Sequence, residues 1–271
     1  MAVTRETPFF RQFRQAVSQL GGMFNAHLHL DRYGTLDNRY LAPAQLRILE
    51  ASYISLHRKH SLIGVLHEGP AFDRDDLERR VNEALDTMVS CGTRRADTMV
   101  DVTDDRVGLD ALQTLAGVRQ QRAADIELRL AAYSPLGFRD AQPRQWEIFA
   151  EGARRADFLG ALPEADDTGE YPDHIGFMEH CRRMLELAQE LGKSVHVHTD
   201  QRNEPAEAGT ERLVECVRRH GAPAAADGEP MVWAVHVVSP STYDEARFGR
   251  LLEGLLEHNI GVICCPSAAI P

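Results

Sequence analysis

The sequence predicts an α/β fold: a TIM-type (β/α)8 barrel in which seven strands are recognisable and the eighth is missing from the chain. Three observations predict it. Apolar runs and amphipathic helical patterns alternate from residue 22 to the end, as in a parallel sheet covered by helices. The 271 residues, 43% of them apolar, are enough for one barrel-sized domain. Histidines also recur near the ends of three predicted strands, the edge at which parallel barrels carry functional groups.

The strands are predicted from short apolar runs bounded by turn residues. They cover residues 23–29, 95–102, 126–134, 158–163, 194–199, 232–239 and 260–266. Helical patterns lie between them at 73–90, 108–124, 143–156, 172–191, 207–220 and 242–258, and Gly192 and Gly221 are expected to end two of these helices. A doubly wound open sheet is the competing architecture, but the stretch HLHLDRYGTLD after the first strand has no GxGxxG phosphate loop.

Two further segments lie outside this alternation. Residues 1–21 predict an N-terminal helix with Phe9, Phe13, Val17 and Leu20 on one face. Such a face usually packs on the barrel and less often anchors a partner or a membrane. Residues 32–71 are too long for a simple loop and carry their own helical pattern, so the 22–271 barrel is expected to contain a helical lid insertion there. His57, His60 and His67 in this lid are expected at the surface.

Charge and cysteine content restrict the class of partner. The chain has 30 Lys and Arg against 41 Asp and Glu, a net charge of −11, which argues against nucleic acid or an anionic membrane as partner. No apolar stretch approaches the roughly 20 residues that cross a bilayer. Five scattered cysteines without CxxC spacing fit reduced thiols and a cytoplasmic protein. A small-molecule substrate is therefore the expected partner.

The histidine pattern is the main indication of chemistry. In FNAHLHLDR, His27 and His29 share one face of the first strand, because strand side chains alternate. His198 ends the fifth strand and His236 lies near the end of the sixth, whereas His196 is expected one layer deeper as a hydrogen-bonded core residue. A pair of solvent-facing histidines is the alternative for the first motif taken alone. Four buried imidazoles at one end of three strands instead indicate a metal ion.

The ordered motifs resemble the amidohydrolase superfamily, and in particular its cytosine deaminase-like branch. The HxH of the first strand and the histidines of the fifth and sixth carry the likeness, and it extends to CGTRRADTMVDVTDD, IELRLAAYSPLGF, FLGALPEADD and GVICCPSAAI. The resemblance implies one divalent metal ion (Zn, Fe or Mn) held by His27, His29 and His198, with His236 near the attacking water. It implies hydrolysis of a C–N bond in a small cyclic amide, amidine or nitrogen heterocycle.

The chain departs from this pattern at the substrate side of the site. Gln201 stands where the branch has a glutamate that shuttles a proton, and an amide cannot transfer protons at ordinary pH. Asp200 could serve instead, so His236, Asp200 and Gln201 are the catalytic candidates. Pro135 replaces a pyrimidine-binding glutamine, which argues against cytosine itself. The candidates for substrate contact are the strand-end residues Asp101, Met99 and Ser134; for Asp101, Asp104 and Asp105 a solvated acidic loop is the competing interpretation.

The eighth strand and its aspartate have no counterpart before Pro271. Three explanations are open: a longer native chain, a homo-oligomer or second chain that completes the barrel, or a remnant that binds without catalysing. The last explanation supplies the alternative function, a catalytically weakened binding or scaffold protein with the amidohydrolase fold.

Overall fold

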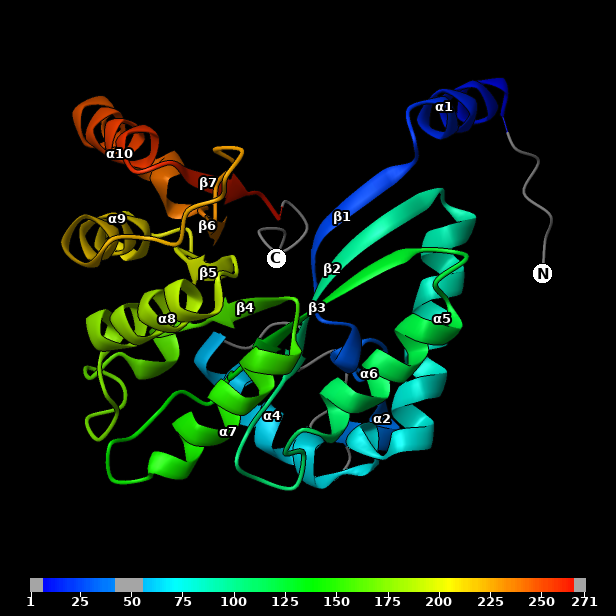
Figure 1. Cartoon of the computed structure of the whole chain (residues 1–271), viewed down its shortest axis with the longest axis horizontal. Coiled ribbons are helices and arrows are strands. Elements are labelled where there is room, and N and C mark those ends of the chain that lie inside the picture. Colours follow the sequence, from blue (N-terminus) through cyan, green and yellow to red (C-terminus); the bar gives the residue numbers. More distant parts are fainter. Residues whose placement is uncertain (1–6, 42–55, 266–271) are drawn as a thin grey trace.

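Seven parallel strands form one sheet that curls into a half-barrel, with helices on its outer face (Figure 1). The computed structural model describes residues 7–41 and 56–265, and for residues 56–61 it describes the backbone alone. Strand order in the sheet follows the sequence from β1 to β7. The predicted fold is thus confirmed, and within the described residues β1 and β7 are the two edges of the sheet.

All seven predicted strands are present, most of them one to several residues shorter than expected. They are β1 Met23–Leu28, β2 Thr93–Asp101, β3 Glu127–Tyr133, β4 Phe158–Ala161, β5 Val195–Thr199, β6 Val232–His236 and β7 Ile260–Ile263. β6 ends early because His236 and Val237 take positive φ angles of 77° and 51°, which no strand can continue through.

The predicted helices are confirmed as well. They are α1 Pro8–Gln19, α5 Arg74–Ser90, α6 Asp110–Gln121, α7 Pro143–Arg155, α8 Phe177–Leu191, α9 Gly209–His220 and α10 Glu245–Glu257. α8 begins later than expected because Gly176, at φ 89°, breaks the segment before it. Gly192 ends the same helix in the left-handed conformation, as its position predicted.

The segment predicted as a lid contains α2, Asn38–Leu41, and α4, Leu56–Glu68, and residues 42–55 lie outside the described part. α4 runs into the short 3-10 helix η3, Pro70–Phe72, which packs on α4 and on α5. The helical content is therefore confirmed, while the lid function stays a prediction.

Side chains alternate between two layers along the strands. Ala96, Val100 and their equivalents pack against the helices in the main core. Residues of opposite parity form a second, smaller cluster inside the curl: Met99, Ala131, Tyr133, Phe158, Leu162 and Ala165. The histidines of β5 pack against this inner layer, since the ring centre of His196 lies 4.5 Å from that of Phe158.

The apolar face of α1 does not pack on the barrel, so that expectation is wrong. No residue of α1 is buried, and Phe9 and the following Leu20 are 68% and 86% exposed.

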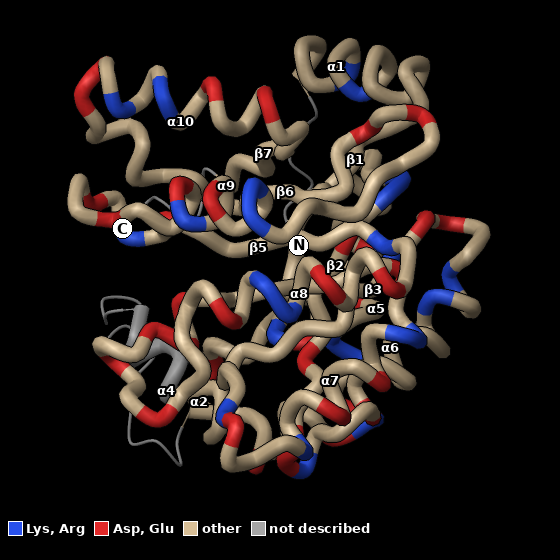
Figure 2. Tube along the Cα trace, turned by 60° about the vertical axis from the view of Figure 1, so that its left-hand side comes forward, with Lys and Arg blue, Asp and Glu red and all other residues tan. Residues whose placement is uncertain are grey.

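Lys and Arg alternate with Asp and Glu along the outer helices (Figure 2). Within the described ranges, no helix combines the length and apolar character needed to cross a membrane.

Gly160 of β4 offers a test of the inner layer. A Cβ added there would overlap Sδ of Met99 and would lie 3.0 Å from the ring of Tyr133. We expect Gly160→Ala to lower the free energy of unfolding by about 1–3 kcal/mol, because a packed core cannot absorb the added methyl. Urea denaturation measures the change.

Gly117 of α6 is the matched control, because nothing lies within 4 Å of the position that an added Cβ would take. Gly117→Ala should leave the protein unchanged or stabilise it by up to about 1 kcal/mol. Equal effects of the two substitutions would mean that the inner layer is not packed as described.

Candidate metal centre

Four histidines meet at the carboxyl edge of the sheet. His27 lies in β1 and His29 directly follows that strand, while His198 lies in β5 and His236 ends β6. Parallel strands bring their carboxyl ends to one edge, so residues distant in the sequence become neighbours there. The ring centre of His198 lies 4.7 Å from that of His27, 5.4 Å from that of His29 and 5.3 Å from that of His236.

The nitrogen atoms have the spacing of ligands on one ion. Nε2 of His198 is 3.1 Å from Nε2 of His27 and 3.3 Å from Nε2 of His29. Two nitrogens bound tetrahedrally at about 2.0–2.1 Å lie about 3.3 Å apart. Ligand atoms of His27, His198 and His236 all lie within 4.8 Å of one another.

The tautomer of His198 supports the same interpretation. Its Nδ1 lies 2.9 Å from the carbonyl oxygen of Ala161 and must donate to it, so Nε2 carries the lone pair. One lone pair cannot accept from both facing Nε2 atoms, and a cation between the three nitrogens removes the conflict. Burial and, secondly, His236 lower the pKa of His27 to about 3, and burial lowers the pKa of His236 to about 4. Neutral imidazoles are the form that binds a metal, and the donor set fits a divalent ion.

The end of β6 is held in a strained conformation. His236 and Val237 both have positive φ, which is rare for residues other than glycine and especially for a β-branched one. The amide of Val237 donates to the carbonyl oxygen of Thr199 at 3.2 Å, which fixes this turn against β5. Strain of this kind costs on the order of 1–3 kcal/mol per residue and is found at functional sites, here where His236 joins the cluster.

Asp200, one of the catalytic candidates, uses its carboxylate at the start of α9. Oδ1 accepts from the amide of Gly209 at 2.7 Å, and Oδ2 accepts from the amide and the hydroxyl of Thr210 at 2.9 and 2.5 Å. This cap explains why α9 begins at Gly209 rather than at the expected residue 207. Asp200 therefore lies directly after β5, but both of its carboxylate oxygens are hydrogen-bonded to the first residues of α9.

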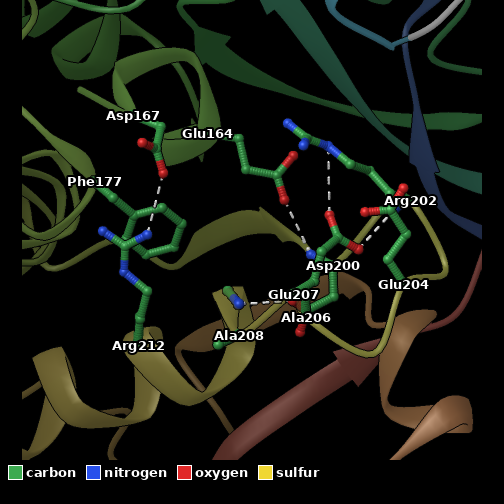
Figure 3. Close-up of a pocket in the computed structure, with 11 residues that line it drawn as sticks. Glu164, Asp167, Phe177, Asp200, Arg202, Glu204, Ala206, Glu207, Ala208 and Arg212 are labelled. Atoms are coloured by element: carbon green, nitrogen blue, oxygen red, sulfur yellow. Dashed lines mark hydrogen bonds and ion pairs between the residues drawn. The ribbon is translucent and has the colours of Figure 1, made fainter. Parts of the chain in front are cut away.

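Gln201, the second candidate, donates from Nε2 to Oε2 of Glu164 at 2.8 Å. Glu164 lies in the 3-10 helix η4, Pro163–Asp166, just after β4. It lines a cavity of about 250 Å³ together with Phe177, Asp200, Glu207 and Arg212 (Figure 3). Sequence reasoning did not single out Glu164, although it stands three residues after β4 as Gln201 stands two after β5.

Of the candidates for substrate contact, Met99 and Ser134 are buried at the strand ends. Met99 belongs to the inner layer, on which Tyr133 also lies. The ring of Tyr133, which sequence reasoning missed, is 5.1 Å from the rings of His29 and His198. Its position at the end of β3, with inward parity, was the available indication. Tyr133 is therefore the aromatic residue next to His29 and His198, and Met99 lies in the same inner layer.

Asp101 is fully buried and paired, so the solvated acidic loop is wrong for this residue. Arg32 binds both of its oxygens, with Nε 3.0 Å from Oδ2. Nε2 of His67 donates to Oδ2 at 2.9 Å, and Nδ1 of His67 donates to Asp105 at 2.6 Å. The surface position expected for His67 is likewise wrong, since its exposure is 0%. The side chains of His57 and His60 lie outside the described part.

The ion pairs of His67 with Asp101 and Asp105 connect α4 to the segment at the end of β2. Burial alone would lower the pKa of His67, but its hydrogen bonds to Asp101 and Asp105 raise it to about 9. Burial alone would raise the pKa of Asp105, but the hydrogen bond and charge of His67, with the hydrogen bonds from Thr103 and the amide of Val107, together lower it to about 2. Asp31, whose Oδ2 accepts from the amide of Asp101, has its pKa raised to about 7 by burial and by Asp101.

His196 lies one layer below the other histidines, as expected, between Phe158 and Trp233. Its Nδ1 is buried and has no hydrogen-bond partner among the described residues, so the expectation of a hydrogen-bonded core histidine is wrong. Burial and then the nearby His27 lower the pKa of His196 to about 3.

The chain is similar to several known proteins. No family model matches the chain. It is 28% identical over 265 residues to an uncharacterized protein of Haemophilus influenzae, covering 97% of this chain and 87% of that protein. The solved 5-methylcytosine deaminase of Klebsiella pneumoniae with phosphonocytosine matches 92% of this chain at 25% identity and a TM-score of 0.75. N-isopropylammelide isopropylaminohydrolase of Burkholderia multivorans has the same fold, with 17% identity, 92% of this chain covered and a TM-score of 0.64.

The chain spans 55% of the length of the deaminase and 60% of that of the isopropylaminohydrolase. Within that span the resemblance to the cytosine deaminase-like branch is confirmed.

The metal site predicts different behaviour for two histidines of β5. His198→Ala should lose most bound zinc, because it removes the nitrogen that lies between those of His27 and His29. His196→Ala should keep the metal and lower stability, since its ring packs in the inner layer. Elemental analysis after dialysis measures the metal. Zinc lost from His196→Ala but retained by His198→Ala would refute the assignment.

His67 predicts a pH-dependent stability. Its pKa rises from 6.5 in the unfolded chain to about 9 in the folded one, so its contribution is complete below about pH 6.5 and disappears as the pH rises through 9. His67→Gln should therefore cost about 2–3 kcal/mol at pH 6 and much less at pH 9.5, measured by urea unfolding at both pH values. His220→Gln, at the exposed end of α9, is the control substitution. A loss that is equal at both pH values for His67→Gln would contradict the network.

Proposed function

We propose that this chain, which has the fold of cytosine deaminase-like amidohydrolases, hydrolyses a C–N bond of a small cyclic amide, amidine or nitrogen heterocycle. The observation that carries the proposal is the convergence of the ligand atoms of His27, His198 and His236 within 4.8 Å of one another, with Nε2 of His29 3.3 Å from Nε2 of His198. Similar folds bind 5-fluorocytosine and phosphonocytosine or act on N-isopropylammelide, which supports the substrate class.

His27, His29 and His198 would hold the ion, which in the proposal is zinc, iron or manganese. When bound, it supplies Lewis-acid chemistry and lowers the pKa of a water molecule toward neutral. His198 is pre-oriented for this by its hydrogen bond to Ala161. His236 stands beside the three ligands and is the residue proposed to hydrogen-bond the attacking water.

The remaining residues would shape the pocket. The ring of Tyr133 and the apolar Met99 provide a flat wall suited to a planar heterocycle rather than to a peptide. Arg32 lies with its guanidinium 5.5 Å from the ring centre of Tyr133 and can meet a carbonyl or anionic edge of the substrate. No disulfide links the five cysteines, and the proposal places the protein in a reducing compartment such as the cytosol.

Release of ammonia or amine tests the proposal. The protein loaded in turn with zinc, ferrous iron and manganese would be assayed on 5-methylcytosine, 5-fluorocytosine and N-isopropylammelide. We expect turnover of at least one compound, and a loss of at least about 100-fold in kcat/KM for His236→Ala. His220→Ala, on the exposed end of α9, is the matched control and should keep full activity.

The binding or scaffold alternative predicts another result. Stoichiometric metal, tight binding of a heterocycle and no product from any of the three compounds would favour it over hydrolysis.

A further inference from the structure

Glu164 is a carboxyl at the mouth of the barrel to which nothing so far gives a role. We propose that Glu164 is the proton-transfer residue of this site and that Gln201 holds it in position. The inference rests on the proposed hydrolysis, and it assigns to η4 a function that the amide of Gln201 cannot perform.

The geometry links Glu164 to the same strand end as the histidines. Ala161 of β4 accepts the hydrogen bond of His198, and Glu164 follows three residues later. Oε1 of Glu164 accepts from the amide of Asp200 at 3.1 Å (Figure 3). Oε2 accepts from Gln201 at 2.8 Å. These two hydrogen bonds fix the carboxyl across the loop that follows β5, and Glu164 also lines the cavity of about 250 Å³.

The neighbouring charges make a proton easy to take up and to release. Burial, then Glu207 and Asp200, raise the pKa of Glu164 to about 7, against the lowering effects of Gln201 and Arg202. A proton carrier works best with a pKa near the working pH, because both of its forms are then populated. The other ionisable groups around it are Tyr133 on β3, Asp167 after η4, Glu204 in the loop after β5 and Arg212 on α9.

The other carboxyls near Gln201 are committed elsewhere. Asp200 caps α9. Asp166 accepts from Nδ1 of both His174 and His180 at 2.7 Å. Glu207 accepts from the amide of Arg202 at 2.9 Å and from the hydroxyl of Ser239. Glu164 is therefore the carboxyl of this group that combines a pKa near neutrality with a hydrogen bond to Gln201.

The proton balance is simple. The carboxylate of Glu164 takes a proton from the attacking water as the water oxygen bonds to the substrate carbon. The protonated carboxyl then gives that proton to the departing nitrogen as the C–N bond breaks and the nitrogen leaves with the electron pair. Glu164 returns to its starting state, so no other reactant is needed.

Three variants test the assignment on the metal-loaded protein. Glu164→Gln keeps the size and an acceptor oxygen but removes the titrating group. Glu164→Gln combined with Gln201→Glu moves the carboxyl across the same hydrogen bond, and Glu257→Gln on the exposed side of α10 is the control. Infrared titration of the carboxyl band is read between pH 5 and 9, with and without metal. The pH profile of kcat is read on whichever of 5-methylcytosine, 5-fluorocytosine and N-isopropylammelide is hydrolysed.

Asp31 and Glu164 should both contribute to a carboxyl band that titrates near pH 7 in the parent and in Glu257→Gln. We expect Glu164→Gln to lose the contribution of Glu164 while that of Asp31 remains. We expect Glu164→Gln to lower kcat by about 100-fold or more and to remove the corresponding limb of the pH profile, and the exchanged variant to recover to within about tenfold. A merely structural role would leave the profile unchanged and would not be rescued by the exchange.

Two results overturn the inference. One is a Glu164→Gln variant whose carboxyl band titrates between pH 5 and 9 with the same amplitude as in the parent, which decides the question even if none of the three compounds is hydrolysed. The other is a Glu164→Gln variant that keeps the kcat and pH profile of the parent. Failure of the proposed function looks different, because the parent itself would then release no product from any compound.

Discussion

The structure depends on one constraint, which is that four imidazoles share a small volume at the edge of a parallel sheet. Buried polar groups are costly unless they are paired, and the single lone pair of His198 cannot satisfy the two nitrogens that face it at 3.1 and 3.3 Å. A divalent cation satisfies all of them at once. The strained backbone at His236 and Val237 has the same explanation, because the chain holds an unfavourable conformation where it delivers the fourth ring.

Around this centre, the surrounding carboxyls have distinct and mostly structural tasks. Asp200 accepts hydrogen bonds from the first residues of α9. Asp101 binds both Arg32, four residues after β1, and His67 of α4. Glu164 of η4 accepts a hydrogen bond from Gln201 in the loop after β5. These contacts link the segments that surround the histidines to one another. The proposed chemistry and the proposed role of Glu164 both depend on these separate hydrogen-bonding roles of the carboxyls.

The sequence was sufficient for the strands, the helices and the convergence of the four histidines, because each follows from a local period: two for the strands, 3.6 for the helices, and parity at a strand end for the histidines. It was insufficient wherever a polar side chain chooses between distant partners. His67 reads as a surface residue of a helical insertion, yet Asp101 lies 34 positions away in the sequence and binds it in the core. Asp200 reads as a base beside a metal ligand, and its true partners on α9 appear only once the loop is folded. The exposed face of α1 shows the same limit for apolar residues, since periodicity gives a face but not what covers it.

X-ray absorption at the metal edge of the zinc-loaded protein tests the central claim most directly. The account predicts a first shell of at least three imidazole nitrogens at about 2.0–2.1 Å, with the outer-shell scattering typical of histidine rings, and loss of that scattering in His198→Ala. A shell of sulfur at about 2.3 Å, or one made almost wholly of water oxygen, would contradict it and would mean that the four histidines do not form the metal centre.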